Sequence, residues 1–231
     1  GYELFDLEPV KVDSTYIESE FLAQTDIINH TVTTKDIFPF QSNEAEIRPL
    51  MEAFISERGF PTRGRVRIRK IPGGGLLHFR TSGIYIPHAF EGHVDGGLFY
   101  LQYPFTIAHE MAHGYGFTDE SVCNYIAYKV CRSSDNPWIR YSAELAYWRY
   151  LSGYYKYFYP GKWETLYESL DPKVKTYLEE MRRHVERYKD WMPEYRDKIY
   201  DAYLKRHGVH AGIRSYNQMI LLIAADRSKD H

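Results

Sequence analysis

The segment His109-Glu110-Met111-Ala112-His113 constrains this chain more than any other, because it places three ionisable side chains inside an apolar stretch. Ile107 and Ala108 before it are apolar too, so the pattern indicates a helix that is largely surrounded by protein. Residues four apart on a helix lie on one face, so both imidazoles can reach one ion. Buried imidazoles and carboxylates need partners, and a metal ion supplies them.

Two imidazoles and one carboxylate form a ligand set that suits Zn2+ and leaves a fourth position for water. His109 and His113 are the predicted ligands, and Glu110 is placed to deprotonate a metal-activated water. The pattern therefore predicts a zinc-dependent peptidase with Glu110 as general base. The five-residue motif also occurs by chance on solvated helices, but an exposed helix would not be apolar around it.

Two neighbouring acidic residues compete for the third ligand position. Asp119 gives the spacing HExxHxxGxxD, where metzincins usually carry His. Glu120 begins a further predicted helix, on which Asn124 lies on the same face. We favour Glu120 as the ligand and Asp119 as the N-cap of that helix. Asn124 is then expected to orient a ligand His through a hydrogen bond.

Apolar periodicity divides the chain into two early helices, a short β region and a long helical remainder. The predicted helices cover residues 14–30, capped by Asp13 or Ser14, and residues 44–58, ended by Gly59. Three strands are predicted within residues 65–69, 76–87 and 91–103, the last around Leu98-Phe99-Tyr100.

Pro104 suits the first turn of a helix, and from there to Ala225 the pattern is helical. Breaks are expected near residues 114–118, 133–137, 160–161, 171–172, 193 and 208–212. The predicted fold class is α+β, mainly helical, with a small early sheet beside the motif helix. Residues 1–60 form an N-terminal helical region and residues 61–231 the main domain, together one compact unit.

Composition excludes several classes of function. The chain has 231 residues and a net charge of -2, which gives no reason to expect nucleic-acid binding. It has no run of about 18 apolar residues that could span a membrane, and no signal peptide is expected. Cys123 and Cys131, eight residues apart on one predicted helix, are too distant for a disulfide and are expected to be separate core thiols.

Several stretches together resemble the DUF3810 family of bacterial proteins. They are residues 104–113, Gly116-Phe117, Glu120 through Asn124 to Tyr128, Ser82 to Tyr85 with Pro87, Arg140 to Ser142, and Tyr216 to Ala224. The resemblance covers roughly residues 60 to 225. Where the family usually reads E-D-E-A-N, this chain keeps Glu120 and Asn124 but has Val122 in place of the middle Glu.

The resemblance implies a zincin-like domain of the gluzincin type, with Glu120 as the third zinc ligand. It also implies transmembrane helices before this domain, so we expect a membrane tether outside this sequence and an extracytoplasmic location on a bacterial membrane. A peptide or protein is the expected substrate. Tyr141, within the matching residues 140–142, is the candidate donor to the oxyanion, although a core tyrosine with a satisfied hydroxyl is the more ordinary interpretation.

Two further features bear on the cavity that such a site needs. Residues 81–87 are interpreted as an edge strand that could hold an extended peptide by strand addition. The aromatic run from Tyr147 to Tyr159 is interpreted as helix packing, with a carbohydrate- or membrane-facing surface as the alternative. The competing functions for the whole chain are a non-catalytic metal-binding sensor or scaffold domain of a membrane protein, and an interaction domain with an accidental motif.

Overall fold

Helices dominate the fold. The computed structural model describes residues 1–32, 40–193 and 218–229. Its helices are α1 (Ser14–His30), α2 (Phe40–Ser56), α3 (Tyr103–Gly114), α4 (Glu120–Arg132), α5 (Pro137–Phe158), α6 (Trp163–Glu168), α7 (Pro172–Glu186) and α9 (Gln218–Lys229). Its strands are β1 (Arg67–Ile71), β2 (Gly83–Ile86) and β3 (Glu91–Asp95). The predicted class, mainly helical α+β with a small sheet, is confirmed.

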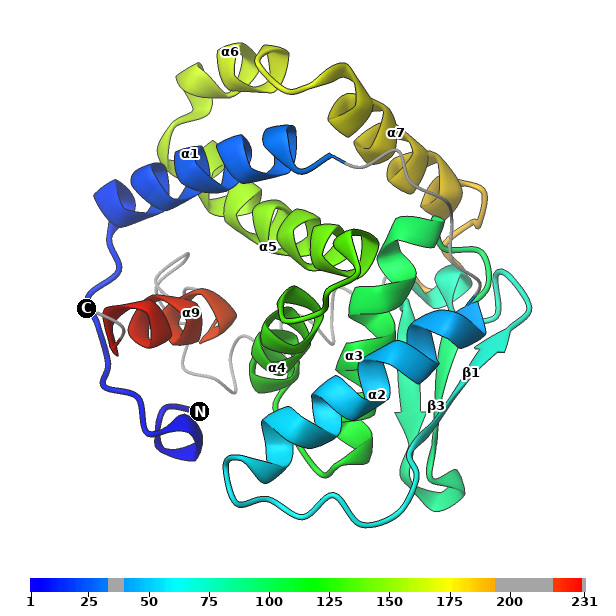
Figure 1. The fold of residues 1–231 in the computed structure, drawn as a ribbon. Coiled ribbons are helices and arrows are strands. Elements are labelled where there is room, and N and C mark those ends of the chain that lie inside the picture. Colours follow the sequence, from blue (N-terminus) through cyan, green and yellow to red (C-terminus); the bar gives the residue numbers. More distant parts are fainter. Residues whose placement is uncertain (33–39, 194–217, 230–231) are drawn as a thin grey trace.

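The motif helix α3 lies between the sheet and the other helices (Figure 1). The strands pack against one side of α3, while α2, α4 and α5 pack against the rest of it. Helix α1 runs along α5, and α9 lies beside α4. One continuous cluster of buried apolar side chains extends through these helices, so the N-terminal helices share a core with the residues around the motif.

The sheet has the strand order β1-β3-β2, with β1 parallel and β2 antiparallel to the central β3. Within the described residues β2 therefore lies at an edge, as expected for residues 81–87. Arg69 of β1 donates two hydrogen bonds of 2.8 Å to the carboxylate of Glu91 on β3, a bidentate pair that fixes the end of the parallel ladder.

Two of the strand predictions were wrong in extent. Residues 76–87 do not form one strand, because a short 3-10 turn at Leu77–Phe79 and a left-handed Arg80 (φ 57°) interrupt them. The strand predicted around residues 98–100 lies earlier, at Glu91–Asp95, and a 3-10 turn follows at Tyr100–Gln102. Alternating apolar residues alone could not locate these turns.

A single buried carboxylate accounts for the turn that precedes β2. Asp95 is fully buried at the end of β3, where it accepts four backbone hydrogen bonds of 2.6–2.9 Å. The donors are the N–H groups of Gly74, Leu76, Leu77 and Gly97. Side-chain bonds of this kind replace the ladder bonds that a longer strand would have made. Asp95 thereby holds the connection between β1 and β2 in place.

The helix predictions agree well with the structure. Asp13 caps α1 by accepting a 3.1 Å hydrogen bond from the backbone of Tyr16, and Pro104 lies in the first turn of α3. Helix α2 begins earlier than expected, at Phe40. A break in the helices was predicted near Pro193, but α7 already ends at Glu186. The break predicted at residues 208–212 lies outside the described residues.

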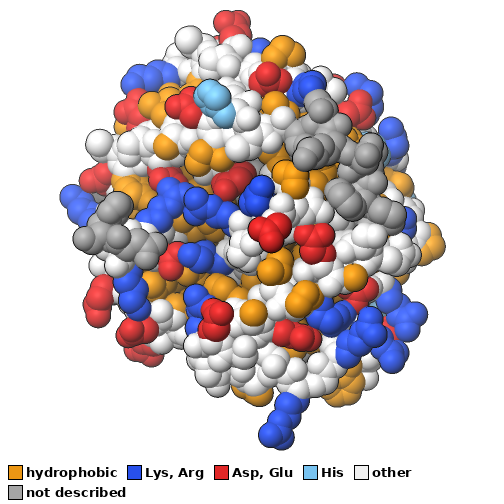
Figure 2. All heavy atoms as spheres, viewed as in Figure 1, with side chains coloured by type: hydrophobic (Ala, Val, Ile, Leu, Met, Phe, Trp, Pro, Cys, Tyr) orange, Lys and Arg blue, Asp and Glu red, His pale blue; other side chains and the backbone are white. Residues whose placement is uncertain are grey.

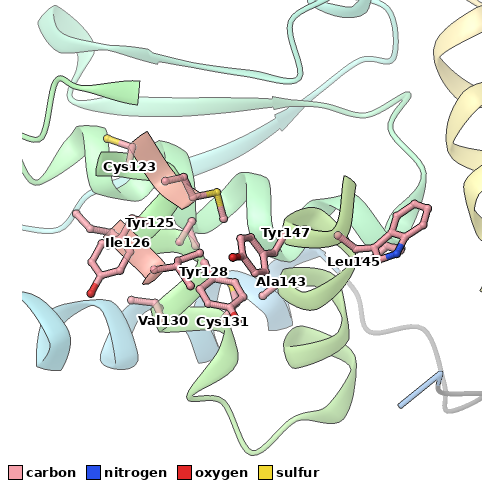
Figure 3. Close-up of a cluster of buried hydrophobic side chains, with 14 of the residues drawn as sticks. Cys123, Tyr125, Ile126, Tyr128, Val130, Cys131, Ala143, Leu145 and Tyr147 are labelled. Atoms are coloured by element: carbon pink, nitrogen blue, oxygen red, sulfur yellow. The ribbon is translucent and has the colours of Figure 1, made fainter. Parts of the chain in front are cut away.

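The centre of the core lies where α4 packs on α5 (Figure 3). The Tyr128 and Tyr147 rings lie 5.0 Å apart between the two helices. Cys123 and Cys131 lie on α4, are both buried and are not joined by a disulfide, as predicted. This packing fixes the position of α4 relative to the rest of the molecule.

On the molecular surface, acidic and basic side chains are interspersed over the face shown in Figure 2. They do not gather there into a patch of one sign. Among the described residues, no helix has both the length and the apolar composition that crossing a membrane requires.

Candidate metal centre

Helix α3 presents its motif residues to two different neighbours. Ile107, Ala108, Met111 and Ala112 are fully buried and anchor the helix in the core. Successive helical residues point about 100° apart, so Glu110 cannot share the direction of His109 and His113. The two imidazoles face α4, whereas Glu110 faces the sheet.

Three possible ligand atoms converge between α3 and α4. Nε2 of His109 lies 3.1 Å from Nε2 of His113 and 3.1 Å from Oε2 of Glu120. Nε2 of His113 lies 3.5 Å from Oε1 of Glu120. Ligands about 2.0–2.1 Å from one zinc ion in tetrahedral geometry lie roughly 3.3 Å from each other. The two Glu120 distances end on different oxygens, and one ligand atom from each residue lies within 4.8 Å of the others, close enough for the three side chains to surround one ion. We name these residues the His-Glu cluster.

The turn after α3 orients His113. Gly116 adopts a left-handed conformation (φ 101°), as predicted, and reverses the chain. The carbonyl of Phe117 consequently lies 2.8 Å from Nδ1 of His113. A carbonyl only accepts hydrogen bonds, so Nδ1 carries a proton, and Nε2 is the nitrogen that would present a lone pair to a metal once the ring is neutral. This is the arrangement that a metal-binding histidine needs.

The start of α4 separates the roles of the two acidic residues. Asp119 accepts a 2.9 Å hydrogen bond from the backbone of Val122, which confirms it as the N-cap. Glu120 is the next residue and points at both imidazoles. Among the described residues, it completes the group of His, Cys, Asp and Glu side chains whose atoms could hold one metal ion.

Contacts within the cluster shift the pKa values of Glu120 and His113. Hydrogen bonds with His109 and His113 hold the pKa of Glu120 well below its usual range. Burial lowers the pKa of His113, but hydrogen bonds with Cys123 and Glu120 outweigh burial and raise this pKa to about 11. A proton and a metal ion thus compete for the same His113 nitrogen. The thiol of Cys123, 3.4 Å from Nδ1 of His113, is a neighbour that the sequence did not predict.

Glu110 lies in a tight, apolar place against the sheet. It is only 3% exposed, and its Oε2 atom is buried without a hydrogen-bond partner in the described part of the chain. A Cβ atom added to Gly83 would lie 2.4 Å from Oε1 of Glu110, and one added to Gly92 would lie 3.0 Å from its Cβ. Burial raises the pKa of Glu110 to about 7, although the two imidazoles lower it. A carboxyl with such a pKa can exchange a proton near neutral pH.

A large cavity of about 1460 Å³ opens beside the His-Glu cluster. Its walls come from β2, α3, the start of α4, α5, α6 and α7. His109, Glu110, His113, Glu120 and Asn124 all line it. The candidate ligands and Glu110 therefore face a space large enough for a peptide segment.

Comparison with known protein families matches residues 22–224 to the family described as "Protein of unknown function (DUF3810)". The chain belongs to the DUF3810 family. The match begins within α1 and ends within α9, so it also includes the helices that precede the sheet. No curated protein and no solved structure matches the chain.

Tyr141, the predicted oxyanion donor, lies in the core of this DUF3810 protein. It is 1% exposed, and its ring packs against Tyr177. Its hydroxyl has no hydrogen-bond partner among the described residues, and Tyr141 is not one of those that line the cavity. Tyr150 follows Tyr141 by nine residues, or about two and a half turns of α5, so the two side chains lie on opposite sides of the helix. Tyr150, unlike Tyr141, lines the cavity.

Tyr150 lies near the His-Glu cluster. Burial raises the pKa of Tyr150, and the neighbouring groups that also affect it are Arg149, Glu120 and Asn124. Asn124 is buried on the face of α4 that carries Glu120, as expected. Its hydrogen bond is with Tyr150, whereas the ring of His113 is held by the carbonyl of Phe117. Tyr150 belongs to the aromatic run from Tyr147 to Tyr159, and the sequence alone could not distinguish this cavity residue from the core residues around it.

Proposed function

We propose that this protein is a zinc-dependent peptidase, with His109, His113 and Glu120 as zinc ligands. The observation that carries the proposal is the convergence of these three side chains at the wall of a large cavity, with the buried carboxyl of Glu110 beside them. Two imidazoles and one carboxylate are a ligand set that zinc takes, and one ligand atom from each of the three residues lies within 4.8 Å of the others.

When bound, zinc supplies a Lewis acid that lowers the pKa of water toward neutrality. Glu110, which lines the cavity, takes the proton from the attacking water and passes it to the departing amine. A pKa of about 7 suits both transfers. The hydroxyl of Tyr150, kept protonated by its raised pKa, can donate a hydrogen bond to the oxyanion that forms on the carbonyl.

Strand β2 offers a place for the substrate backbone. It is the edge strand next to β3, and residues Ser82 to Tyr85 line the same cavity as the cluster. A peptide in extended conformation can add to such an edge through main-chain hydrogen bonds, whatever its side chains. This mode brings a peptide bond past Glu110, since Gly83 of β2 lies directly against that side chain.

We further propose that the domain acts on the extracytoplasmic side of a bacterial membrane, tethered by helices outside this sequence. The support for the tether is the pattern of transmembrane segments expected from the family resemblance. Detection of the full-length protein in isolated membranes, with the domain accessible to protease added from the extracytoplasmic side, tests this location.

Zinc content and peptide hydrolysis together test the catalytic proposal. The purified protein should contain one zinc per chain by elemental analysis and should hydrolyse members of a quenched-fluorescent peptide mixture. Glu110→Gln should retain zinc and folded structure but lose about 10²–10⁴-fold in turnover, since that is the usual contribution of a general base.

Three results would contradict the proposal or part of it. Absence of any bound transition metal would show that the motif is accidental. Stoichiometric zinc without hydrolysis of any peptide in the mixture would support a sensor or scaffold domain instead. Equal turnover by Glu110→Gln and the unaltered protein would remove Glu110 from the role of base.

A further inference from the structure

Arg149 extends from α5 into the wall of the cavity that contains the His-Glu cluster. Its side chain is exposed to the cavity. Protein nevertheless encloses it, and this enclosure lowers its pKa, although a guanidinium stays charged at neutral pH. Ser142, seven residues earlier on the same face of α5, also lines the cavity. Arg149 is therefore part of a continuous face that α5 turns toward the site.

The other basic side chains that line the cavity are already engaged. They have these partners: Asp190 at 3.7 Å for Arg80, Glu179 at 2.7 Å for Arg182, and the ring of Trp163 at 3.8 Å for Lys156. The guanidinium of Arg149 makes neither a hydrogen bond nor an ion pair with any residue that the structure describes. Because this side chain is exposed to the cavity, its guanidinium is hydrated and remains available to a ligand that enters there.

The position of Arg149 relates it to the metal centre. It precedes Tyr150, which interacts with both Glu120 and Asn124 of α4. Arg149, Tyr150 and the residues of the His-Glu cluster line the same cavity. A ligand that fills this cavity can therefore contact both the cluster and this guanidinium.

A guanidinium presents a planar set of N–H donors that matches a carboxylate in bidentate fashion. We propose that Arg149 binds a carboxylate of the peptide substrate and so selects which peptides enter the site. The inference rests on the proposed peptidase function. The carboxylate belongs either to the C-terminus of the peptide or to an acidic side chain near the bond that is cleaved, and binding measurements can distinguish these two sources.

The experiment uses the whole chain with the Glu110→Gln substitution, so that bound peptides are not cleaved. The probes are two mixtures of N-acetylated hexapeptides with randomised sequence, one with free C-terminal carboxylates and one with C-terminal amides. Peptides retained by the immobilised protein are quantified by mass spectrometry. The same measurement is made after adding Arg149→Met, or Lys156→Met as a control that also removes one positive charge from the cavity.

If the C-terminal carboxylate is bound, the free-acid peptides should be retained about tenfold or more over the amides, as expected for hydrogen bonds to a charged group. If an acidic side chain is bound, peptides with Asp or Glu should be enriched to a similar degree in both mixtures. In either case Arg149→Met should abolish the preference and Lys156→Met should preserve it. Zinc content and circular dichroism establish that each variant is folded.

Retention that shows no carboxylate preference, or a preference that Arg149→Met leaves unchanged, would overturn the inference. An equal loss in Lys156→Met would overturn it as well, because the effect would then belong to the general charge of the cavity. These outcomes are independent of turnover. A protein that binds carboxylates through Arg149 but hydrolyses nothing would contradict the peptidase proposal alone.

Discussion

Gly83 of β2 leaves the space that the side chain of Glu110 occupies: a Cβ atom at this position would lie 2.4 Å from Oε1 and 2.8 Å from Cγ of Glu110. Contacts this short are far inside the van der Waals limit. Glu110 is buried, so its side chain has little freedom to move away. The edge strand of the sheet therefore determines where the proposed general base can lie.

Gly83→Ala should accordingly reduce turnover by about 10²-fold or more, since displacing a catalytic group by about 1 Å has that effect. Zinc content should be unchanged, because none of the three proposed ligands contacts Gly83. The matched control is Gly153→Ala on α5, where an added Cβ meets no atom within 4 Å. Kinetics and elemental analysis of both variants check this, and full activity in Gly83→Ala would refute the proposed constraint.

The two acidic residues at the start of α4 should differ sharply in their effect on zinc. Glu120→Gln should weaken zinc binding by more than the roughly 10–100-fold typical of residues outside the ligand sphere. Asp119→Asn should retain zinc, because Asn also caps a helix. Competition with a chromogenic chelator measures both affinities. The opposite order would make Asp119 the ligand, in the spacing HExxHxxGxxD.

Two tyrosines of α5 provide a further contrast. Tyr150→Phe should lower kcat by about 10²–10³-fold with little change in KM, as expected when a donor to the oxyanion is removed. Tyr141→Phe should keep full activity and should not destabilise the protein, because its buried hydroxyl has no partner to lose. Steady-state kinetics and thermal unfolding of both variants test this, and a kinetic defect confined to Tyr141→Phe would restore Tyr141 to the site.

Asp95→Asn should destabilise the fold by about 2–4 kcal/mol. The carboxylate accepts four backbone hydrogen bonds, and bonds to a charged group each contribute about 1.5–3 kcal/mol, of which an amide can replace only part. Urea unfolding measures the change. Asp135→Asn, at an exposed position, serves as the control, and a difference of less than about 0.5 kcal/mol between the two variants would contradict this account.

Local patterns in the sequence predicted those features that depend on neighbouring residues. The span of α1, the left-handed turn at Gly116 and the cap at Asp119 follow from periodicity and turn chemistry, and the structure confirms them. The position of Glu120 beside both imidazoles also follows from a short spacing. Its role as a zinc ligand stays a prediction.

Features that join distant parts of the chain were beyond the sequence. Gly83 and Glu110 come together only because the sheet packs on α3. The carboxylate of Asp95 holds the backbone of residues 74–77 in a turn, although residues 76 and 77 were predicted to begin a strand. Tyr150 and Arg149 lie among core aromatics, and only the packing of α5 shows which face lines the cavity.

The proposed ligands and base all lie within residues 109–120, on two consecutive helices joined by one turn. About half of the residues that line the cavity, in contrast, come from β2, α5, α6 and α7, which are remote from that segment in the sequence. Substitutions in the cavity wall can therefore change which substrates bind, while the twelve-residue segment that would hold the metal stays unchanged. Members of such a family can diverge in specificity without having to reinvent their chemistry.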